Sequence, residues 1–385
     1  MTDWPKIPKD GRHGRALVTL IGLTFSLLTA ACAPNLAPSG PNITAPRLAE
    51  SSFTTADGIS LPMRRWFPPA ISRSMKFTDG ITKVRVASGN SGDAENHAEI
   101  KAVILALHGF NDYSKSFENT GKILAALGMA VFAYDQRGFG EAPHRGLWAG
   151  HETLTGDLAA VSRILRRRYP GKPLYLLGDS MGGAVILAAF DSADPPEAEG
   201  VILAAPAVWA RSTMPWPQRA VLWLSARTIP WVKFSGSGLK IQASDNIEML
   251  RKLGRDPLVI KETRVDAVHG LVDLMDRALT AGPALHRPAL LLYGDKDQIV
   301  PREPTLLLWS ELPGTQSSEQ RLALYGNGWH MLLRDLDAGV VLADIIQWIE
   351  DRAEKRSRPL PSGAETPARE ILKDYRERLE NPVTD

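Results

Sequence analysis

A short stretch from Leu174 to Leu187, Leu-Tyr-Leu-Leu-Gly-Asp-Ser-Met-Gly-Gly-Ala-Val-Ile-Leu, places the strictest demand on how this chain folds. An apolar run rich in strand formers enters a Gly-x-Ser-x-Gly core, and a second apolar run with helical spacing leaves it. This strand–turn–helix order is typical of a turn that lifts a nucleophilic serine, here Ser180, above the edge of a sheet. Gly178 and Gly182 leave room where strand and helix cross. The alternative is an ordinary Gly/Ser turn, which the flanking pattern disfavours.

The same alternation of strand and helix continues on both sides of this stretch. Continuous apolar runs predict strands that are buried on both faces, and helices are expected near 116–127 and 152–168. An alternating segment over 53–67, centred on Asp57-Gly58, predicts a β-hairpin. The fold class is therefore α/β, with a mostly parallel, doubly wound sheet whose ligands bind beyond the carboxyl ends of the strands. The apolar strand runs are 102–107, 129–134, 174–178, 200–205, 289–293 and 320–325.

The strand at 102–107 ends in His108-Gly109-Phe110, at a place where a loop can supply one N–H of an oxyanion hole. We expect the backbone amides of Phe110 and Met181 to be the two donors. His108 is interpreted as a structural histidine that braces this loop and not as a catalytic base. The Asp-Gln-Arg-Gly turn at 135–138 is likewise interpreted as an Asp–Arg pair that ties a loop down.

The acid and the base are expected after the nucleophile, because on this fold the order along the chain is Ser, then Asp or Glu, then His. Of eight histidines, only His330 lies beyond the acid loop and just past a strand end. Asp295 and Asp297 both follow the strand at 289–293. We choose Asp297, because the Gly-x-x-Asp spacing carries its carboxylate toward the histidine loop, and we expect Asp295 to stabilise the turn.

The rhythm of strands and helices stops over residues 206–286, which hold several prolines, helical pieces and four tryptophans. This segment is predicted to be an inserted cap. One interpretation is an apolar lid that shapes a groove for an acyl chain. The other is that the rings only form the small core of the cap itself. The tryptophans are Trp209, Trp216, Trp223 and Trp231.

From about residue 53 to 350, the chain resembles the monoacylglycerol lipase/lysophospholipase-like branch of the α/β-hydrolase superfamily, whose members are often labelled serine aminopeptidases. The resemblance implies the α/β-hydrolase fold with an inserted helical cap, and it implies Ser180 as nucleophile, Asp297 as acid, His330 as base, and Phe110 and Met181 as oxyanion donors. The motifs that carry it are His108-Gly-Phe110, Tyr134-Asp-Gln-Arg-Gly138, Gly178-Asp-Ser-Met-Gly182, Gly294-x-x-Asp297 and His330-Met-Leu-Leu-Arg-Asp335.

The amino terminus indicates export. A basic segment precedes an apolar run that ends at Ala31, so residues 1–31 are predicted to be a signal peptide. The run ends on the only cysteine, Cys32, as in a bacterial lipoprotein signal, although Thr29 stands where an aliphatic residue is usual. The alternatives are an ordinary exported protein or an unlipidated Cys32. Residues 32–52 are Pro-rich and are expected to form a semi-extended tether to the membrane of a bacterial cell envelope.

Charge and composition exclude some classes of partner. The chain of 385 residues has 45 basic and 43 acidic side chains, and without residues 1–31 the numbers are 41 and 41. Binding to nucleic acid and polybasic attraction to a membrane are therefore not expected.

The domain organisation is predicted as a core over 53–205 and 287–350, interrupted by the cap at 206–286, with a surface insertion at 71–100. A charged, peripheral tail over 351–385 has a possible helix from Thr366-Pro367.

The residues together predict a serine hydrolase that cleaves carboxylic esters through an acyl-enzyme, with no need for a cofactor or a metal. The apolar cap favours a lipid-like substrate such as a monoacylglycerol or a lysophospholipid. One alternative keeps the same three residues but cleaves amides, as an amidase or aminopeptidase. Another is an inactive lipid-binding protein of the cell envelope.

Overall fold

The computed structural model describes residues 36–69, 99–238, 241–315 and 319–365. The predicted signal peptide, Cys32 and the predicted helix from Thr366 lie outside the described residues. So does nearly all of the predicted insertion at 71–100, of which only residues 99 and 100 are described. The predictions for these segments therefore stay predictions.

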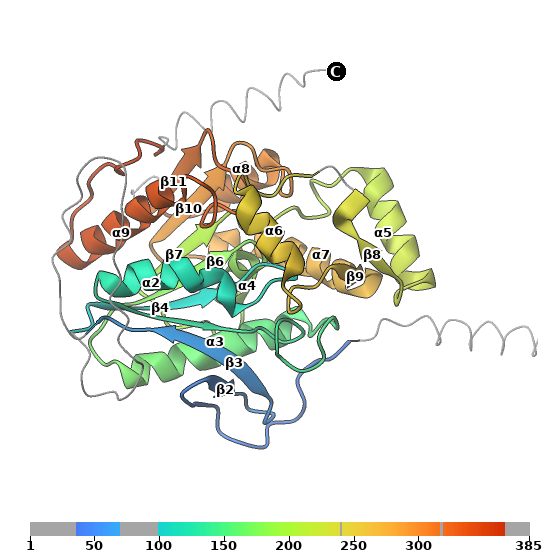
Figure 1. Ribbon diagram of the computed structural model, residues 1–385, viewed down its shortest axis with the longest axis horizontal. Helices are drawn as coiled ribbons and strands as arrows, with labels where there is room; N and C mark the ends of the chain where they lie inside the picture. Colours follow the sequence, from blue (N-terminus) through green and yellow to red (C-terminus); the bar gives the residue numbers. More distant parts are fainter. Residues whose placement is uncertain (1–35, 70–98, 239–240, 316–318, 366–385) are drawn as a thin grey trace, which may run out of the picture.

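A nine-stranded sheet runs through the middle of the described residues (Figure 1). Its first strands form antiparallel pairs, and the strands from β5 to β11 run parallel, which confirms the predicted α/β class. The central strands are buried along their whole length, because βα crossovers cover both faces of a parallel sheet. In spatial order the strands are β1 (Arg47–Leu48), β2 (Ser52–Thr54), β3 (Ser60–Trp66), β5 (Met129–Tyr134), β4 (Ala102–Leu107), β6 (Leu174–Asp179), β7 (Gly200–Ala204), β10 (Ala289–Gly294) and β11 (Gln320–Tyr325).

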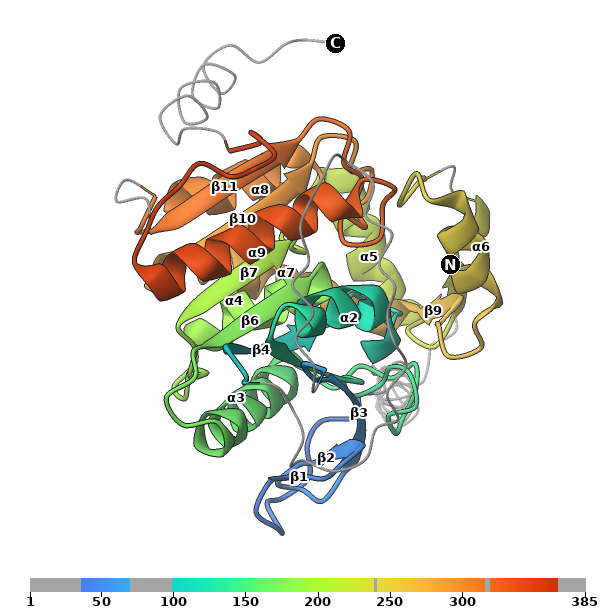
Figure 2. The same ribbon diagram turned by 60° about the vertical axis from the view of Figure 1, so that its left-hand side comes forward.

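Helices cover both faces of the sheet, and each face has its own buried apolar cluster. Figure 2 shows α2 and α9 together on one face. None of the described helices is both long enough and apolar enough to cross a membrane. One face is covered by α3 (His151–Arg168), α4 (Met181–Phe190), α7 (Val265–Thr280) and α8 (Arg302–Glu311), and the other by α2 (Glu118–Ala126), which follows the short helix η1 (Ser114–Phe117), and α9 (Ala338–Glu354).

The cap is an excursion between β7 and β10, which are neighbours in the sheet. Its elements are α5 (Trp216–Thr228), β8 (Lys233–Ser235), η2 (Gly236–Gly238), α6 (Ile247–Arg255) and β9 (Glu262–Arg264). A helical cap was predicted, but the cap also contains strands: β8 and β9 pair as a small antiparallel sheet.

The predicted limit of the cap at residue 286 needs a correction. Helix α7 and the short helix η3 (Gly282–Ala284) fall inside the predicted range, but α7 packs on α4 and is part of the core. Its Leu271, Leu274 and Ala278 belong to the same buried cluster as α3 and α4. The cap proper therefore ends near Arg264. Amphipathic spacing is the same in a cap helix and a core helix, so the sequence did not separate them.

The predicted tether also needs a correction, because its described part is packed on the body of the protein. The amide N–H of Ala37 donates to the carbonyl of Trp148 at 2.8 Å, and that of Ser39 donates to Thr153 Oγ1 at 3.1 Å. Strand β1 then pairs with β2, so the sheet starts within the predicted tether. Prolines remove some backbone donors, but the residues between them keep their N–H groups and can dock.

The tail is likewise docked as far as it is described. After α9 the chain returns along β11, where the amide N–H of Leu324 donates to the carbonyl of Ala364 at 2.9 Å. Leu360 is buried, and Arg358 Nε donates to Asp351 Oδ1 at 2.6 Å. The prediction of a peripheral tail from residue 351 is therefore wrong for residues 351–365. It stays a prediction for the remainder.

Candidate active site

Ser180 lies on the predicted sharp turn between β6 and α4. Its backbone has φ +51° and ψ −112°, a sparsely populated conformation that persists only where the surroundings impose it. A Cβ on Gly182 would lie 2.0 Å from the carbonyl oxygen of Leu107, and one on Gly178 would lie 2.5 Å from Gly183 Cα. Both glycines are therefore required by close backbone contact, as the motif indicated. The turn lifts the Ser180 hydroxyl above the carboxyl end of the sheet.

Three distant loops place a hydroxyl, an imidazole and a carboxylate in line. His330 Nε2 lies 2.9 Å from Ser180 Oγ, and His330 Nδ1 lies 2.7 Å from Asp297 Oδ2. The other carboxylate oxygen, Asp297 Oδ1, accepts the amide N–H groups of Ile299 and Val300 at 2.7 and 2.9 Å. The Asp297 side chain is fully buried. These contacts fix the carboxylate, and through it the orientation of the imidazole ring.

Asp295, the other acid considered for this site, points elsewhere. Its Oδ1 lies 3.3 Å from Arg302 Nη1, and both side chains are about one third exposed. Its backbone N–H donates to the carbonyl of Tyr325 at 3.0 Å. The structure therefore brings Asp297 to His330 and places Asp295 in the turn.

The groups around His330 shift the pKa of its imidazole. Burial lowers the pKa of this imidazole, but the charge of Asp297, the hydrogen bond to it and the charge of Asp179 raise the pKa, and the net shift is upward. A raised pKa means a stronger base, provided that the pH is high enough to leave the ring neutral. A neutral imidazole that donates from Nδ1 to Asp297 leaves Nε2 as an acceptor facing Ser180. This arrangement can remove the proton from the hydroxyl.

The two residues that are predicted to supply the oxyanion donors are close to the serine in the chain or in space. Met181 is the first residue of α4, so its amide N–H has no carbonyl partner one turn earlier in the helix. Gly109 lies so close to the turn that a Cβ on it would be 3.4 Å from Ser180 Cβ, and Phe110 follows directly. The Phe110 ring packs against Phe139 with ring centroids 5.5 Å apart. The loop that holds the Phe110 amide is thus packed beside the nucleophile.

His108 braces this loop, as interpreted from the sequence. It is fully buried, and burial lowers the pKa of its imidazole. Its Nε2 accepts the backbone N–H of Gln136 at 2.9 Å, and its Nδ1 lies 2.8 Å from the carbonyl of Gly109. The Gln136 side chain also donates to the carbonyl of His108 at 2.9 Å. His108 therefore holds the loop and does not reach the serine.

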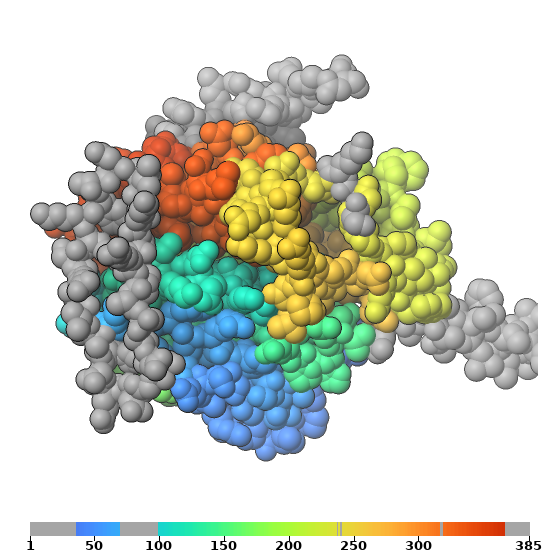
Figure 3. Space-filling view, viewed as in Figure 1, coloured from blue at the N-terminus to red at the C-terminus, as the bar shows by residue number. Residues whose placement is uncertain are grey.

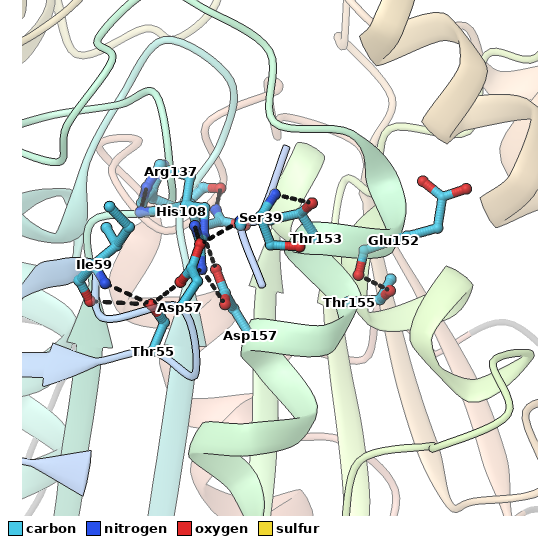
Figure 4. A network of polar contacts seen from close by, with 12 residues as sticks. Ser39, Thr55, Asp57, Ile59, His108, Arg137, Glu152, Thr153, Thr155 and Asp157 are labelled. Atoms are coloured by element: carbon cyan, nitrogen blue, oxygen red, sulfur yellow. Dashed lines mark hydrogen bonds and ion pairs between the residues drawn. The ribbon is translucent and has the colours of Figure 1, made fainter. Parts of the chain in front are cut away.

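Asp135 and Arg137 do not pair with each other, so the predicted Asp–Arg pair is wrong. Figure 4 shows Arg137 between Asp57 and Asp157, with Nη1 at 2.7 Å from Asp57 and Nε at 2.7 Å from Asp157. Asp135 instead accepts the amide N–H of Ser114 at 3.0 Å. Both side chains are structural, but each ties the turn at 135–138 to a different element. Their partners lie far away in the sequence, where spacing gives no signal.

A buried ion cluster beside Ser180, His330 and Asp297 was not predicted. Arg334 Nη1 lies 2.7 Å from Asp112 Oδ2, and Arg334 Nη2 lies 3.8 Å from Asp179 Oδ2. The cluster joins the oxyanion loop, the residue before Ser180 and the loop that carries His330. Burial raises the pKa of Asp179, and the positive charge of Arg334 opposes that rise. The signal that could have indicated it is an acid inside the Gly-x-Ser-x-Gly motif, which needs a cation when buried.

The cluster gives a testable prediction on pH dependence. The charge of Asp179 raises the pKa of His330, so Asp179→Asn should move the acid limb of kcat/KM to lower pH. Asp112→Asn removes the other partner of Arg334 but not a charge that shifts His330, so its acid limb should stay near that of the parent. Rates of a soluble ester from pH 5 to 9, roughly, would measure both. Equal shifts in the two variants would contradict this account.

The cap is hydrogen-bonded to the loops on both sides of the serine. On the histidine loop, the N–H of Met331 donates to the carbonyl of Ala243 at 3.0 Å. On the oxyanion loop, Asn111 Nδ2 donates to Thr263 Oγ1 at 2.7 Å. An apolar cavity of about 390 Å³ lies between α5, β8 and α7, and it is lined by Val221, Leu222, Phe234, Val265, Val268 and their neighbours. The cap is thus held by the loops on both sides of the serine, and it contains an apolar space whose lining residues do not include Ser180, Asp297 or His330.

The four cap tryptophans do not form a core within the cap, and the interpretation that they line an acyl groove stays a prediction. Trp209 is partly buried and packs against the main core, while Trp216, Trp223 and Trp231 are 75, 56 and 49% exposed. The exposed three do not form a core within the cap. None of the four is among the residues that line the cavity beneath α5. In the described part of the chain, no group of three or more His, Cys, Asp or Glu side chains is arranged to hold a metal ion.

Comparison with known proteins gives the family. The sequence profile of the family described as serine aminopeptidase, S33, matches residues 98–337. Monoglyceride lipase from Rattus norvegicus is 30% identical over 271 residues, which cover 68% of this chain and 86% of that protein. Monoacylglycerol lipase from Mycolicibacterium smegmatis is 24% identical over 65% of this chain and 88% of that protein.

Solved structures show the same fold. The crystal structure of Paleococcus ferrophilus monoacylglycerol lipase superposes with a TM-score of 0.55 and 21% identity, and covers 76% of this chain and 99% of that one. A soluble variant of monoglyceride lipase from Saccharomyces cerevisiae gives a TM-score of 0.57 and 20% identity over 83% of this chain and 99% of that one. With the serine turn, the parallel sheet and the inserted cap, these matches show that the chain belongs to the serine aminopeptidase S33 family of α/β-hydrolases, together with the monoglyceride lipases.

Proposed function

We propose that this protein hydrolyses carboxylic esters of lipid-like acids through an acyl-enzyme, with a monoacylglycerol as the favoured class of substrate. The observation that carries the proposal is the continuous hydrogen-bonded line from Ser180 through His330 to Asp297. Relatives named monoglyceride lipase support the class of bond. Ser180 is proposed as nucleophile, His330 as general base and Asp297 as the acid that orients it.

Acylation follows from this geometry. His330 Nε2 takes the proton as Ser180 Oγ attacks the carbonyl carbon of the ester, and a tetrahedral oxyanion forms. The imidazolium stays paired with Asp297 and then gives its proton to the leaving alkoxide. The C–O bond to the alcohol breaks, and the acyl group remains on Ser180. A water molecule, deprotonated by the same imidazole, then attacks the acyl-enzyme and releases the acid.

The proposed oxyanion hole stabilises both tetrahedral intermediates. The proposed donors are the amide N–H groups of Phe110, in the loop beside Ser180, and of Met181, which stands at the N-terminus of α4, where the helix dipole favours negative charge. Removal of one such donor typically costs about 3 kcal/mol of transition-state stabilisation. The hole is built from backbone, so it is fixed before substrate binds.

The cap supports an apolar acyl group. The cavity of about 390 Å³ beneath α5 has a mainly apolar lining, which suits a hydrocarbon chain better than a charged peptide, and we propose that it receives the far part of the acyl chain, since Ser180 itself is not among its lining residues. A substrate panel with one monoacylglycerol, one lysophospholipid, one short soluble ester and one aminoacyl amide would test the assignment. We expect the monoacylglycerol to have the highest kcat/KM. Preference for the aminoacyl amide would replace this proposal with the aminopeptidase alternative.

A lipid anchor on Cys32 is part of the proposed setting, in the envelope of a bacterial cell. The support is the sequence alone, a basic and apolar leader that ends on a lone cysteine. Cys32→Ser is expected to move the protein from the membrane fraction to the soluble fraction when high salt is present. Cell fractionation with an antibody measures this, and Ser39→Ala in the same segment is the matched control. Unchanged fractionation of Cys32→Ser would contradict the anchor.

A further inference from the structure

A second buried acid lies close to His330 in the chain, and the proposed mechanism does not use it. Asp335 is only 6% exposed, and burial raises the pKa of its carboxyl group, while hydrogen bonds from Ser244 and Trp329 oppose that rise. Aspartate is rarely buried without a cation beside it. In the described part of the chain Asp335 forms no ion pair, and hydrogen bonds hold its carboxylate.

The two carboxylate oxygens of Asp335 hold two different parts of the molecule. Oδ2 accepts the backbone N–H of Trp329, the residue directly before His330, at 2.8 Å. Oδ1 accepts the hydroxyl of Ser244, a fully buried residue of the cap, at 2.6 Å. Ser244 Oγ in turn accepts the backbone N–H of Asn246 at 3.1 Å. One buried carboxylate therefore joins the cap to the backbone beside His330.

Further hydrogen bonds join the same two parts of the chain. We call residues 242–246, which precede α6, the pre-α6 segment. The N–H of Met331, the residue directly after His330, donates to the carbonyl of Ala243 at 3.0 Å. Asn246 Nδ2 donates to the carbonyl of Arg334 at 3.0 Å. Figure 3 shows this part of the cap, in yellow, against the orange surface of the chain near β11.

The pre-α6 segment also reaches the loop of the acid. The N–H of Gln242 donates to Gln298 Oε1 at 2.9 Å, and Gln298 directly follows Asp297. This contact is exposed to solvent, whereas Ser244 and Asp335 are buried. The buried pair is therefore the contact on which the position of the segment depends most.

These contacts bear on the alignment of His330 with the serine. Both neighbours of His330 in the chain are held from the side of the cap, Trp329 through Asp335 and Met331 directly. The imidazole has to stay within hydrogen-bond distance of Ser180 Oγ, which is 2.9 Å away. A displacement of about 1 Å can cost about a hundredfold in rate. A backbone that is fixed on both sides of the imidazole limits such displacement.

We propose that Ser244 and Asp335 are positioning residues for His330, so that the cap is part of the support of the base. The inference rests on the proposed function, in which His330 acts as that base. It goes beyond substrate binding, because a residue of the cap then controls turnover of an ester that is too short to fill the cap cavity. A cap inserted in place of this one would need an equivalent contact.

Kinetics on a short soluble ester test the pair, with kcat expressed per site titrated by a fluorophosphonate. Ser244→Ala should lower kcat about tenfold and leave KM within about twofold, because the base is misaligned and the substrate contacts are unchanged. Asp335→Ala loses both hydrogen bonds and should lower kcat about a hundredfold. Asp335→Asn should stay within about threefold of the parent, because its oxygen can accept from Trp329 and its NH₂ group can donate to the Ser244 hydroxyl.

Two controls separate positioning from stability and from loosening of the cap. Ser162 in α3 is also fully buried, and its hydroxyl donates to a carbonyl at 2.8 Å and accepts a backbone N–H at 3.1 Å. Ser162→Ala should lower the thermal unfolding midpoint about as much as Ser244→Ala but keep the kcat of the parent. Tyr113→Phe removes another contact to the cap, the hydrogen bond to Asp256 Oδ2 at 2.8 Å, and should also keep kcat.

Proton NMR gives a readout that does not depend on activity. The proton between His330 Nδ1 and Asp297 Oδ2 is expected far downfield of the amide protons, and His330→Ala assigns its signal. Ser244→Ala should shift or broaden this signal, and Ser162→Ala should leave it unchanged. Loss of the signal in Ser244→Ala would support the positioning role even if the parent hydrolysed no ester, in which case only the proposed function would fail.

Two results would overturn the positioning role in an active parent. The first is a Ser244→Ala protein with the kcat and the downfield signal of the parent. The second is an Asp335→Asn protein that is as slow as Asp335→Ala, because the charge of Asp335 and not its hydrogen bonds would then be the essential feature. If Asp335→Ala does not fold, Ser244→Ala and Asp335→Asn still decide between these outcomes.

Discussion

Replacement of Ser180 by alanine is expected to lower ester turnover by about 10⁶-fold, to the level left by substrate binding and the oxyanion hole. Alanine removes the only atom that can bond to the acyl carbon, Ser180 Oγ, and leaves His330 without its partner at 2.9 Å. The acyl-enzyme cannot form, so a fluorophosphonate probe should not label the variant. Labelling and turnover of a monoacylglycerol measure the two effects.

The control must show that the fold survives. Alanine has the same Cβ as serine, so the strained backbone at φ +51° costs an alanine about as much as a serine. The thermal unfolding midpoint of the variant should therefore stay close to that of the parent. Ser310→Ala removes a hydroxyl that donates to the carbonyl of Leu307 on α8, and it should keep full activity. Labelling of the Ser180→Ala protein would assign the nucleophile to another residue.

Asp297→Asn is expected to lower kcat by about 10⁴-fold. Asp297 Oδ1 already accepts the amides of Ile299 and Val300, so an asparagine would keep its oxygen there and turn its NH₂ group toward His330. That group donates, so His330 Nδ1 would have to accept, and the ring proton would move to Nε2. An imidazole with a proton on Nε2 cannot take one from Ser180. Single-turnover and steady-state rates on a soluble ester measure the loss.

Asp295→Asn is the matched comparison two residues away. Its carboxylate pairs with Arg302 at the surface, so its loss should change turnover by less than about threefold. The reverse ranking, with Asp295→Asn inactive and Asp297→Asn active, would show that the wrong acid has been assigned. If both variants lost activity equally, the turn and not the carboxylate would be the essential feature.

The parts of the fold and the site that could be predicted are those that local pattern determines. The run that became β6, the glycines around Ser180 and the helix after it are specified within fourteen residues, because close crossing of strand and helix allows few sequences. Chain order then singled out His330, since only one histidine follows the acid loop. The choice of Asp297 depended partly on family resemblance, and the geometry agrees with it.

The parts that could not be predicted depend on contacts between residues far apart in the chain. Arg334 forms an ion pair with Asp112, which lies more than two hundred residues earlier in the chain. No spacing in the sequence indicates that these two residues are partners. The bond between Ala37 and the carbonyl of Trp148 turns a predicted tether into a docked segment. The limit of the cap was misplaced for a similar reason, because packing on α4, and not amphipathicity, assigns α7 to the core.

The way the cap is inserted has a consequence for how such enzymes diversify. Strands β7 and β10 are hydrogen-bonded neighbours, with Val201 opposite Ala289, and the chain leaves and re-enters the sheet between them. Residues 205–288 are thus one connection in the topological sense, and its cap part, which ends near Arg264, can be lengthened, shortened or exchanged while the register of the strands stays fixed. New substrate preferences can therefore arise when a different cap is inserted between the same two strands, while the sheet and the catalytic loops stay unchanged.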